Sequence, residues 1–271
     1  MTGKPATGPH DQRATFSTLQ QNSFAIVREK KNLTGYIIDL IGIQIDLIDL
    51  IALLWFLAVW CGYTWYSDHD KGVYNLNSAM NDYRLLWMKR MLDRDVRMVD
   101  TQILGNLMRS MSFFASTTMF IIAGLVAVLG ARGEAMAVLD ELPFVVSSST
   151  VVWDMKVLLL IAIFIYAFFK FTWAFRHYNY CLILVGAVDG HDRLDEECHR
   201  IAERAARIAN STGRHFNRGN RAYYFGMAAL SWFLHPWIFI ALTIWVVLVL
   251  YRREYHSNLL ETLGKPNIQG L

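Results

Sequence analysis

The sequence predicts an all-α membrane protein with four transmembrane helices and two long amphipathic helical segments in the cytoplasm. Of its 271 residues, 54% are hydrophobic and only 18% are charged, whereas soluble proteins average about 25% charged residues. The apolar residues gather in four blocks of about 20 residues, the length that crosses ~30 Å of hydrocarbon as a helix. These blocks are continuously apolar, unlike the alternating strands of a membrane barrel.

The blocks divide the chain into three parts. Residues 1–34 are polar and predict a loosely ordered tail, residues 35–257 form the four-span membrane domain, and residues 258–271 form a C-terminal tail. A polar N-terminus of this length favours a retained first span over a cleaved signal peptide. Pro236 predicts the start of a helix or a kink in the last block. The expected spans are 47–66, 111–130, 157–175 and 229–251.

Helical periodicity extends beyond the spans. In 78–111, apolar residues recur in steps of three and four, which predicts one amphipathic helix. No proline separates it from the second span, so we expect one long bent helix. The segment 193–221 opens with Asp195, Glu196 and Glu197, acids that favour a helix N-terminus.

The positive charges predict the orientation. Segments 67–110 and 176–221 carry seven and eight Lys and Arg residues, whereas loop 131–156 carries two against four acids. Because cytoplasmic loops are enriched in Lys and Arg, we expect both long segments in the cytoplasm and both termini in the periplasm of a bacterial inner membrane. Arg252 and Arg253 favour the opposite placement of the C-terminus.

The most distinctive pattern is a run of arginines, here called the arginine stripe, spaced by 4, 3, 7, 4 and 3 residues. On a continuous helix these side chains share one face, and guanidinium groups bind carboxylate and phosphate. We expect anionic lipid headgroups there, with a solvated surface, a small-molecule site or acids of a neighbouring helix as alternatives. The stripe comprises Arg200, Arg204, Arg207, Arg214, Arg218 and Arg221.

Three ionisable residues lie in or beside the spans: Asp49, Lys170 and His235. Asp49 ends an acidic series with Asp39 and Asp46 at helical spacing. Such residues mark a partner or a pathway. The simpler interpretations are that Asp49 is an acid at the membrane interface, that Lys170 extends its amine to the interface, and that His235 is a hydrogen-bonded structural residue.

Signs of an enzyme are weak. There is no GxSxG, P-loop, GxGxxG or HExxH motif, so we expect no catalytic residue, metal site or cofactor. Three cysteines cannot build a disulfide framework, and a net charge of +3 argues against a nucleic-acid partner. Small residues in the second span suit close helix packing, within the molecule, in a homo-oligomer or with a membrane partner protein. They are Ser112, Ser116, Ala123 and Ala127.

Several strings resemble a bacterial integral-membrane family catalogued as a domain of unknown function, over about 47–257. They are RLLWMKRMLDRD, GNLMRSMSFFAST, FRHYNYC, GRHFNRGNRAYYF, WFLHPW and VLYRRE. The resemblance implies a polytopic membrane protein and no particular chemistry. The strings place a polar layer near one membrane face, with Asn106, Arg109, Arg176, Asn179, His215 and Asn217 beside Arg214, Arg218, Arg221 and His235.

Three functions remain open at this point. The first is a non-enzymatic membrane component that binds anionic lipid or a partner through the arginine stripe. The second is an oligomeric transporter or channel for a small ion or anionic solute, lined by Asp49, Lys170 and His235. The third is a membrane enzyme acting on a lipid headgroup, with His215 or His235 as acid–base.

Overall fold

The computed structural model describes residues 37–40, 43–69, 74–141, 149–188 and 195–264, and the N-terminal tail lies outside them. The chain divides into two compact units, residues 1–51 and 52–271. Four helices are long and apolar enough to cross a membrane: Leu47–His69, Met98–Gly130, Thr150–Gly186 and Pro236–Leu263. The expected helical fold, with four helices long and apolar enough to span a membrane, is thereby confirmed.

A short hairpin precedes the first helix. Strands β1 (Ile37–Leu40) and β2 (Ile43–Asp46) pair antiparallel, with Ile37 opposite Asp46. The acids of this region therefore do not follow a helical face, and that prediction is wrong. Only Asp49 is helical, in the first turn of α2 (Leu47–His69). Because successive residues of a strand lie on opposite faces, the 3.6-residue spacing of a helix does not apply to this region.

The expected single helix over 78–130 is also wrong, because the chain breaks between α3 (Leu76–Leu92) and α4 (Met98–Gly130). Asp100, in the first turn of α4, is fully buried and accepts hydrogen bonds from Trp87 Nε1 at 2.7 Å and from Arg94. These bonds hold the start of α4 against α3. The break also leaves Val96 and Val99 exposed, although the periodicity placed both on a buried face.

The remaining elements are α5 (Arg132–Asp140), α6 (Thr150–Gly186), α7 (Glu196–Leu230), η2 (Ser231–Phe233), α8 (Pro236–Tyr255) and α9 (Asn258–Leu263). Asp195 caps α7 by accepting from Cys198 N–H at 2.9 Å, as the acidic start predicted. The last apolar block is not one span over 229–251, because residues 229–230 end α7 and α8 begins at Pro236. His235 caps α8, and its Nδ1 accepts from Trp237 N–H at 3.2 Å.

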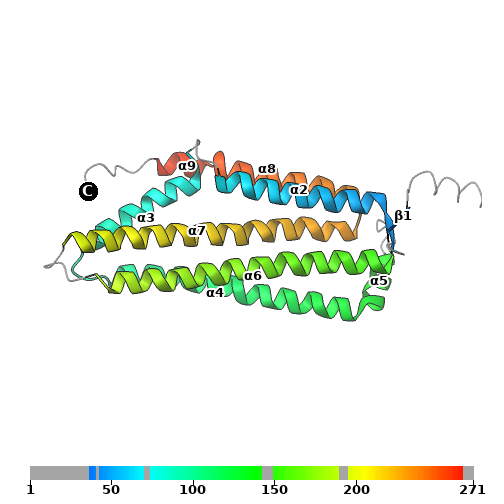
Figure 1. The fold of residues 1–271 in the computed structure, drawn as a ribbon, viewed down its shortest axis with the longest axis horizontal. Helices are drawn as coiled ribbons and strands as arrows, with labels where there is room; N and C mark the ends of the chain where they lie inside the picture. The colour runs from blue at the N-terminus through cyan, green and yellow to red at the C-terminus, as the bar shows by residue number, and fades with distance from the viewer. Residues whose placement is uncertain (1–36, 41–42, 70–73, 142–148, 189–194, 265–271) are drawn as a thin grey trace, which may run out of the picture. The chain divides into compact units, whose positions relative to one another are not determined.

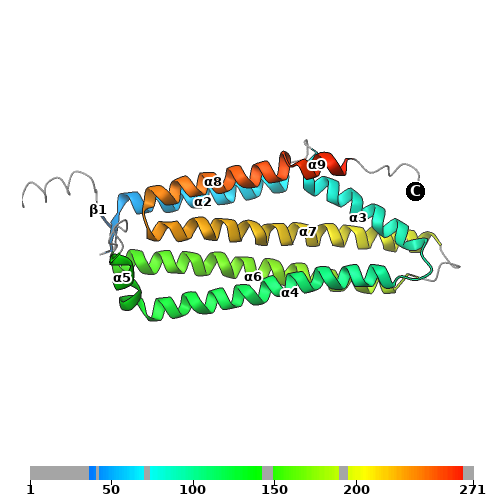
Figure 2. The same ribbon diagram turned by 180° about the vertical axis from the view of Figure 1, so that it is seen from behind.

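Within residues 52–271, α2 and α8 run parallel to each other (Figure 1). Their early turns meet at Phe56 and Phe239, whose ring centroids lie 5.1 Å apart. Their last turns meet where Tyr63 donates to Glu254 at 2.9 Å. Helix α7 runs antiparallel to α2, α8 and α6, and α4 packs antiparallel on α6, as the reverse view shows (Figure 2).

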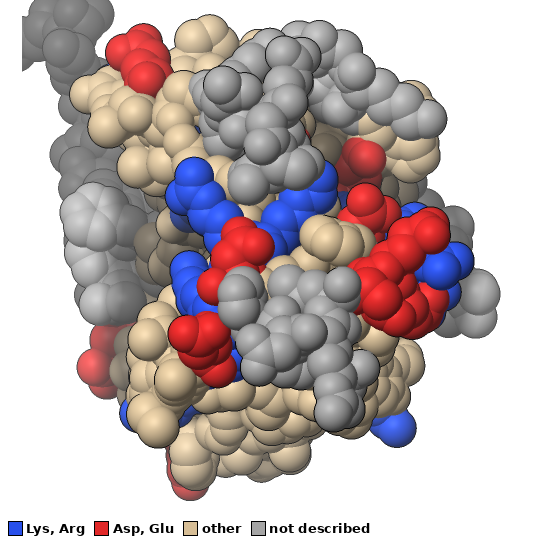
Figure 3. Space-filling model, turned by 90° about the vertical axis from the view of Figure 1, so that its left-hand side faces the viewer, with Lys and Arg blue, Asp and Glu red and all other residues tan. Residues whose placement is uncertain are grey.

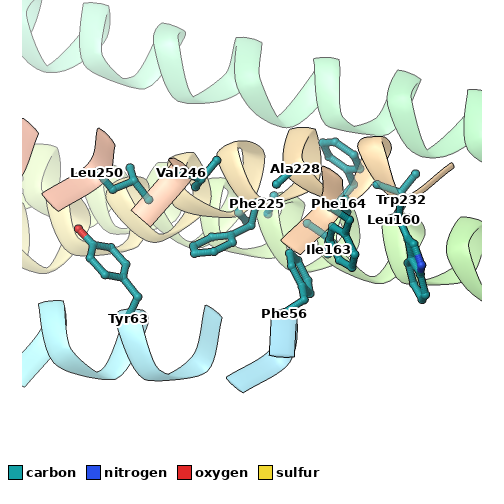
Figure 4. Close-up of a cluster of buried hydrophobic side chains, with 14 of the residues drawn as sticks. Phe56, Tyr63, Leu160, Ile163, Phe164, Phe225, Ala228, Trp232, Val246 and Leu250 are labelled. Carbon is teal, nitrogen blue, oxygen red and sulfur yellow. The ribbon is translucent and has the colours of Figure 1, made fainter. Parts of the chain in front are cut away.

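Apolar side chains from α2, α6, α7 and α8 form one core (Figure 4). Two glycines bring α7 close to α6. A Cβ on Gly219 would lie 2.7 Å from the Phe171 ring, and a Cβ on Gly226 would lie 3.0 Å from the Phe164 ring. The aromatic rings of α6 occupy the space that side chains at these positions would need. This packing explains why α7 carries glycines without breaking.

Candidate anion-binding site between α6 and α7

The arginine stripe lies along one continuous helix, because α7 runs unbroken from Glu196 to Leu230. Gly213 and Gly219 do not interrupt it. Ion pairs nevertheless divide the stripe into three parts with different surroundings.

The first part, at the start of α7, is exposed and balanced by acids of the same helix. Arg200 and Arg204 contact Glu197 at 3.1 and 3.4 Å, and Arg207 contacts Glu203 at 3.6 Å. Basic and acidic side chains are interspersed on the end of the bundle where α7 begins (Figure 3). Exposed pairs of this kind contribute little stability, and the described residues of this end do not form a purely cationic surface.

The last part turns into the bundle. Arg218 and Arg221 both contact Asp68, at 2.9 Å each, and Arg221 also lies 3.6 Å from Glu254. Glu254 accepts further hydrogen bonds from the hydroxyls of Tyr63 at 2.9 Å and Ser67 at 2.8 Å. Two guanidinium groups thus face two carboxylates, and this part is neutral overall. Since a buried charge is tolerated only when it is paired, the network is a structural junction of α2, α7 and α8.

The middle of the stripe is different, because Arg214 forms no ion pair with any described residue. Next to it, the His215 ring packs edge-on against His177 of α6, with centroids 5.0 Å apart. Lys170 of α6 lies nearby, with its Nζ 4.9 Å from the centre of the Tyr166 ring. We call Lys170, His177, Arg214 and His215 the α6–α7 cationic cluster.

The histidines of this cluster have unused polar atoms. Nδ1 of His177 and Nδ1 of His215 are both buried and form no hydrogen bond with the described residues. Burial lowers the pKa of His215 to about 4, and the positive charges of His177, Lys170, Arg218 and Arg214 add to this effect. Asp68, a carboxylate whose charge acts on Lys170, is already bonded to Arg218 and Arg221. Among the described residues, Lys170 and Arg214 of the cluster therefore form no ion pair with a carboxylate.

The structure separates residues that the sequence grouped as intramembrane. Lys156, which lies just before the expected third span, is only 3% exposed, and its Nζ is 5.5 Å from the centre of the Trp232 ring. Lys170 lies 14 residues further along α6, about 21 Å at 1.5 Å per residue. Trp232 precedes His235 in the turn between α7 and α8. Lys170 and His235 therefore lie at different levels of the bundle. Asp49 is buried, in the first turn of α2.

The residues of the expected polar layer lie on several elements. Asn217 donates to Asn77 of α3 at 2.6 Å, and Arg176 donates to the Tyr180 hydroxyl at 2.9 Å. Asn106 accepts from Gln102 within α4, Arg109 is exposed, and Asn179 is half-buried on α6. His235 lies beyond the end of α7, whereas His215 lies in the middle of that helix. Only His215 joins the cluster with Arg214, Lys170 and His177.

Sequence reasoning missed Asp68, Glu254 and His177. Asp68 and Glu254 end two parallel helices, but nothing in one sequence shows that these ends meet. His177 lies in FRHYNYC, a string that resembles the family but contains no motif of known chemistry. The small residues Ser112, Ser116, Ala123 and Ala127 are exposed on α4, and the two serines line a small pocket with residues of α6. Among the described residues, no three His, Cys, Asp or Glu side chains gather as metal ligands.

These features define a multi-pass α-helical membrane protein with a buried ion-pair network and a cationic cluster. The family model described as "Protein of unknown function, DUF599" matches residues 51–259, and the chain belongs to this family. Neither a curated protein nor a solved structure matches the chain.

Proposed function

We propose that this protein is a non-enzymatic membrane component that binds the anionic headgroup of a lipid at the α6–α7 cationic cluster. The observation that carries the proposal is the unbalanced charge of Arg214 and Lys170 beside two histidines with unused Nδ1 atoms. A lipid phosphate would supply both the missing negative charge and acceptor oxygens. Guanidinium binds such a group with two parallel hydrogen bonds.

The depth of the cluster supports a headgroup as the ligand. Arg218, beside the cluster, bonds to Asp68 at the end of α2, and Glu254 near the end of α8 belongs to the same network. Exposed aromatic residues surround this level, among them Trp65 and Tyr66 of α2 and Tyr251 of α8. Tyr and Trp are enriched where helices cross the headgroup layer. Arg214 lies four residues beyond Arg218, about 6 Å further from the hydrocarbon.

We also propose that α7 crosses the membrane with the four candidate spans, through the part of the helix beyond Arg221. Helices α2 and α8 are parallel, and only α4 and α6 of the other candidate spans lie between them in the chain. Two helices that cross the membrane in the same direction need an odd number of crossings between them. The two crossings of α4 and α6 are therefore not enough, and a third crossing is required. The apolar end of α7, residues 222–230, supports this assignment. It puts the C-terminus, with Arg252 and Arg253, on the cytoplasmic side with both basic segments, contrary to the expected periplasmic C-terminus.

The headgroup proposal is tested by lipid retention. Protein extracted in mild detergent is mixed with phosphatidylglycerol and phosphatidylcholine, and bound lipids are counted by native mass spectrometry. We expect Arg214→Gln to reduce retained phosphatidylglycerol several-fold and to leave phosphatidylcholine unchanged. Arg204→Gln is the matched control, because Arg204 is equally exposed on α7 but pairs with Glu197. Equal retention in the two variants would refute the proposal.

A further inference from the structure

A pocket with hydroxyl groups in its walls lies where α4 packs antiparallel against α6 (Figure 2). Its volume is about 170 Å³. A site for a whole small molecule measures roughly 300 Å³ or more, so this pocket takes one part of a longer molecule. Thr172 of its wall follows Lys170 by two residues, about 200° around α6, so the pocket and the α6–α7 cationic cluster lie on different faces of that helix. The walls include Ser112, Ala115 and Ser116 of α4 and Phe168, Thr172 and Phe175 of α6.

The hydroxyls of this pocket are accessible and unused. Thr118 and Thr243 donate to the carbonyl four residues earlier, at 2.6 and 2.7 Å, as hydroxyls within helices often do. Ser112, Ser116 and Thr172 form no hydrogen bond with any described residue, and all three are exposed. An occupant of the pocket can therefore reach three donors. Because polar groups facing lipid are costly unless they are satisfied, these donors favour an occupant that carries acceptor oxygens.

Two arginines continue the walls of the pocket beyond one of its ends. Arg109 lies three residues before Ser112 on α4, and Arg176 lies four residues after Thr172 on α6. Residues three or four apart share a helix face, so each arginine stands on the face that carries a hydroxyl of the pocket. Because α4 and α6 are antiparallel, the two arginines lie beyond the same end of the pocket.

The two arginines lie at one level and have no carboxylate partner. The rings of Phe114 and Phe171 stack 5.2 Å apart between α4 and α6, and Arg109 and Arg176 each lie five residues beyond this contact. Both arginines are exposed, and neither forms an ion pair with a described residue. Arg176 donates through Nε to the Tyr180 hydroxyl at 2.9 Å, which leaves its two terminal nitrogens available.

Charge and depth favour a phospholipid as the occupant. Residues 101–133 and 155–186 contain no Asp or Glu, so α4 and α6 offer only positive charge to an anion at this level. Trp173 and Tyr180 of α6 are exposed beside Arg176, and such residues are enriched where helices cross the headgroup layer. A phosphate at the arginines would place the glycerol esters of the lipid at the hydroxyls and its chains along the apolar surfaces of α4 and α6.

We infer that the α4–α6 pocket binds an anionic glycerophospholipid, with the phosphate at Arg109 and Arg176 and the glycerol esters at the pocket hydroxyls. A second copy of the chain fits less well. Copies in one membrane share their orientation, so a two-fold interface at this face would bring four arginines to one level. The inference rests on the membrane depth proposed for the α6–α7 cationic cluster, but the two sites share no residue.

Removing the two charges tests the phosphate contact. Protein in mild detergent is mixed with phosphatidylglycerol, and retained lipids are counted by native mass spectrometry. The double variant Arg109→Gln/Arg176→Gln should retain one lipid fewer than the wild type, and Arg90→Gln, which removes an exposed arginine of α3 away from the pocket, should lose none. Adding Arg214→Gln to the double variant should remove a further lipid, so the two sites are tested separately. Equal retention in the double variant and Arg90→Gln would overturn the inference.

Filling the pocket tests whether the lipid lies between α4 and α6. Ser116 lines the pocket and is exposed, so Ser116→Trp should fill it from the surface and remove the same lipid. Ala123 lies seven residues further along the same face of α4, is exposed and does not line the pocket, which makes Ala123→Trp the matched control. Equal retention in these two variants would overturn the inference. So would a wild type that forms a lipid-free dimer, or one whose lipid is displaced by glycerol 3-phosphate, which has no acyl chains.

Discussion

The guanidinium of Arg221 lies 2.9 Å from the carboxylate of Asp68, and this ion pair joins the middle of α7 to the end of α2. The Arg221 side chain is only 4% exposed, and Asp68 is shared with Arg218. Removing one member of a buried pair leaves an uncompensated charge. The junction of α2, α7 and α8 therefore depends on the side chain of Arg221, which contacts both Asp68 and Glu254.

Arg221→Gln should destabilise the folded protein by about 3–5 kcal/mol, because Asp68 and Glu254 would both lose a buried partner. Arg204→Gln should cost less than about 1 kcal/mol, because Arg204 and Glu197 are an exposed pair. Thermal unfolding in detergent measures both changes. Similar midpoints for the two variants would show that the buried network does not stabilise the bundle.

The close approach of α6 and α7 predicts opposite effects of alanine at two glycines. In Gly219→Ala the new Cβ would lie 2.7 Å from Phe171, a fully buried ring stacked 5.2 Å from Phe114. Such overpacking costs about 1–3 kcal/mol, which exceeds or cancels the gain of up to about 1 kcal/mol in helix propensity.

Gly124 of α4 is the matched control, because an added Cβ there meets no atom within 4 Å. Gly124→Ala should leave the unfolding midpoint unchanged or raise it, while Gly219→Ala should lower it. A higher midpoint for Gly219→Ala would contradict the packing described for α6 and α7.

Acidification should destabilise the protein partly through His215. The pKa of His215 is lowered from 6.5 to about 4 in the folded state by burial and neighbouring cations. Between these values the unfolded chain binds a proton that the folded chain does not, so stability falls as the pH falls from about 6.5 to 4. His215→Gln should lose less stability over this range, as measured by unfolding midpoints at several pH values. A variant as acid-sensitive as the wild type would exclude this contribution.

The proposed crossing of α7 predicts where the C-terminus lies. A fluorescent protein fused after Leu271 should fold and fluoresce in the cytoplasm, while an alkaline phosphatase fused there should be inactive. An active phosphatase at that position would mean that α7 does not cross. The same pair of reporters fused in loop 131–156, expected in the periplasm, supplies the control.

The sequence predicted the presence of candidate spans where hydrophobic length alone determines them, as in α4 and α6. It failed where a helix boundary depends on tertiary contacts. The break before Met98 depends on buried bonds from Trp87 and Arg94 to Asp100. The end of α7 at Leu230 falls inside a run of 30 residues, 222–251, without Asp, Glu, Lys or Arg, where hydropathy cannot separate one helix from two.

The candidate site was predicted in outline only. The spacing of the arginine stripe placed its members on one helix, but it could not show which of them were neutralised. Arg221 and Asp68 are separated by 153 residues, so their pairing depends on the fold. Once those pairs are known, Arg214 stands out as a member without a carboxylate partner among the described residues.

The most direct test of the proposed headgroup site is the pKa of His215, measured by NMR of histidine-labelled protein in lipid nanodiscs. His215→Gln assigns its signal. In phosphatidylcholine the pKa should stay near its low value, and in phosphatidylglycerol it should rise towards 6.5, because a bound phosphate offsets the cations that lower it. The same low pKa in both lipids, in protein that still binds phosphatidylglycerol, would place the anion elsewhere and contradict the proposed function.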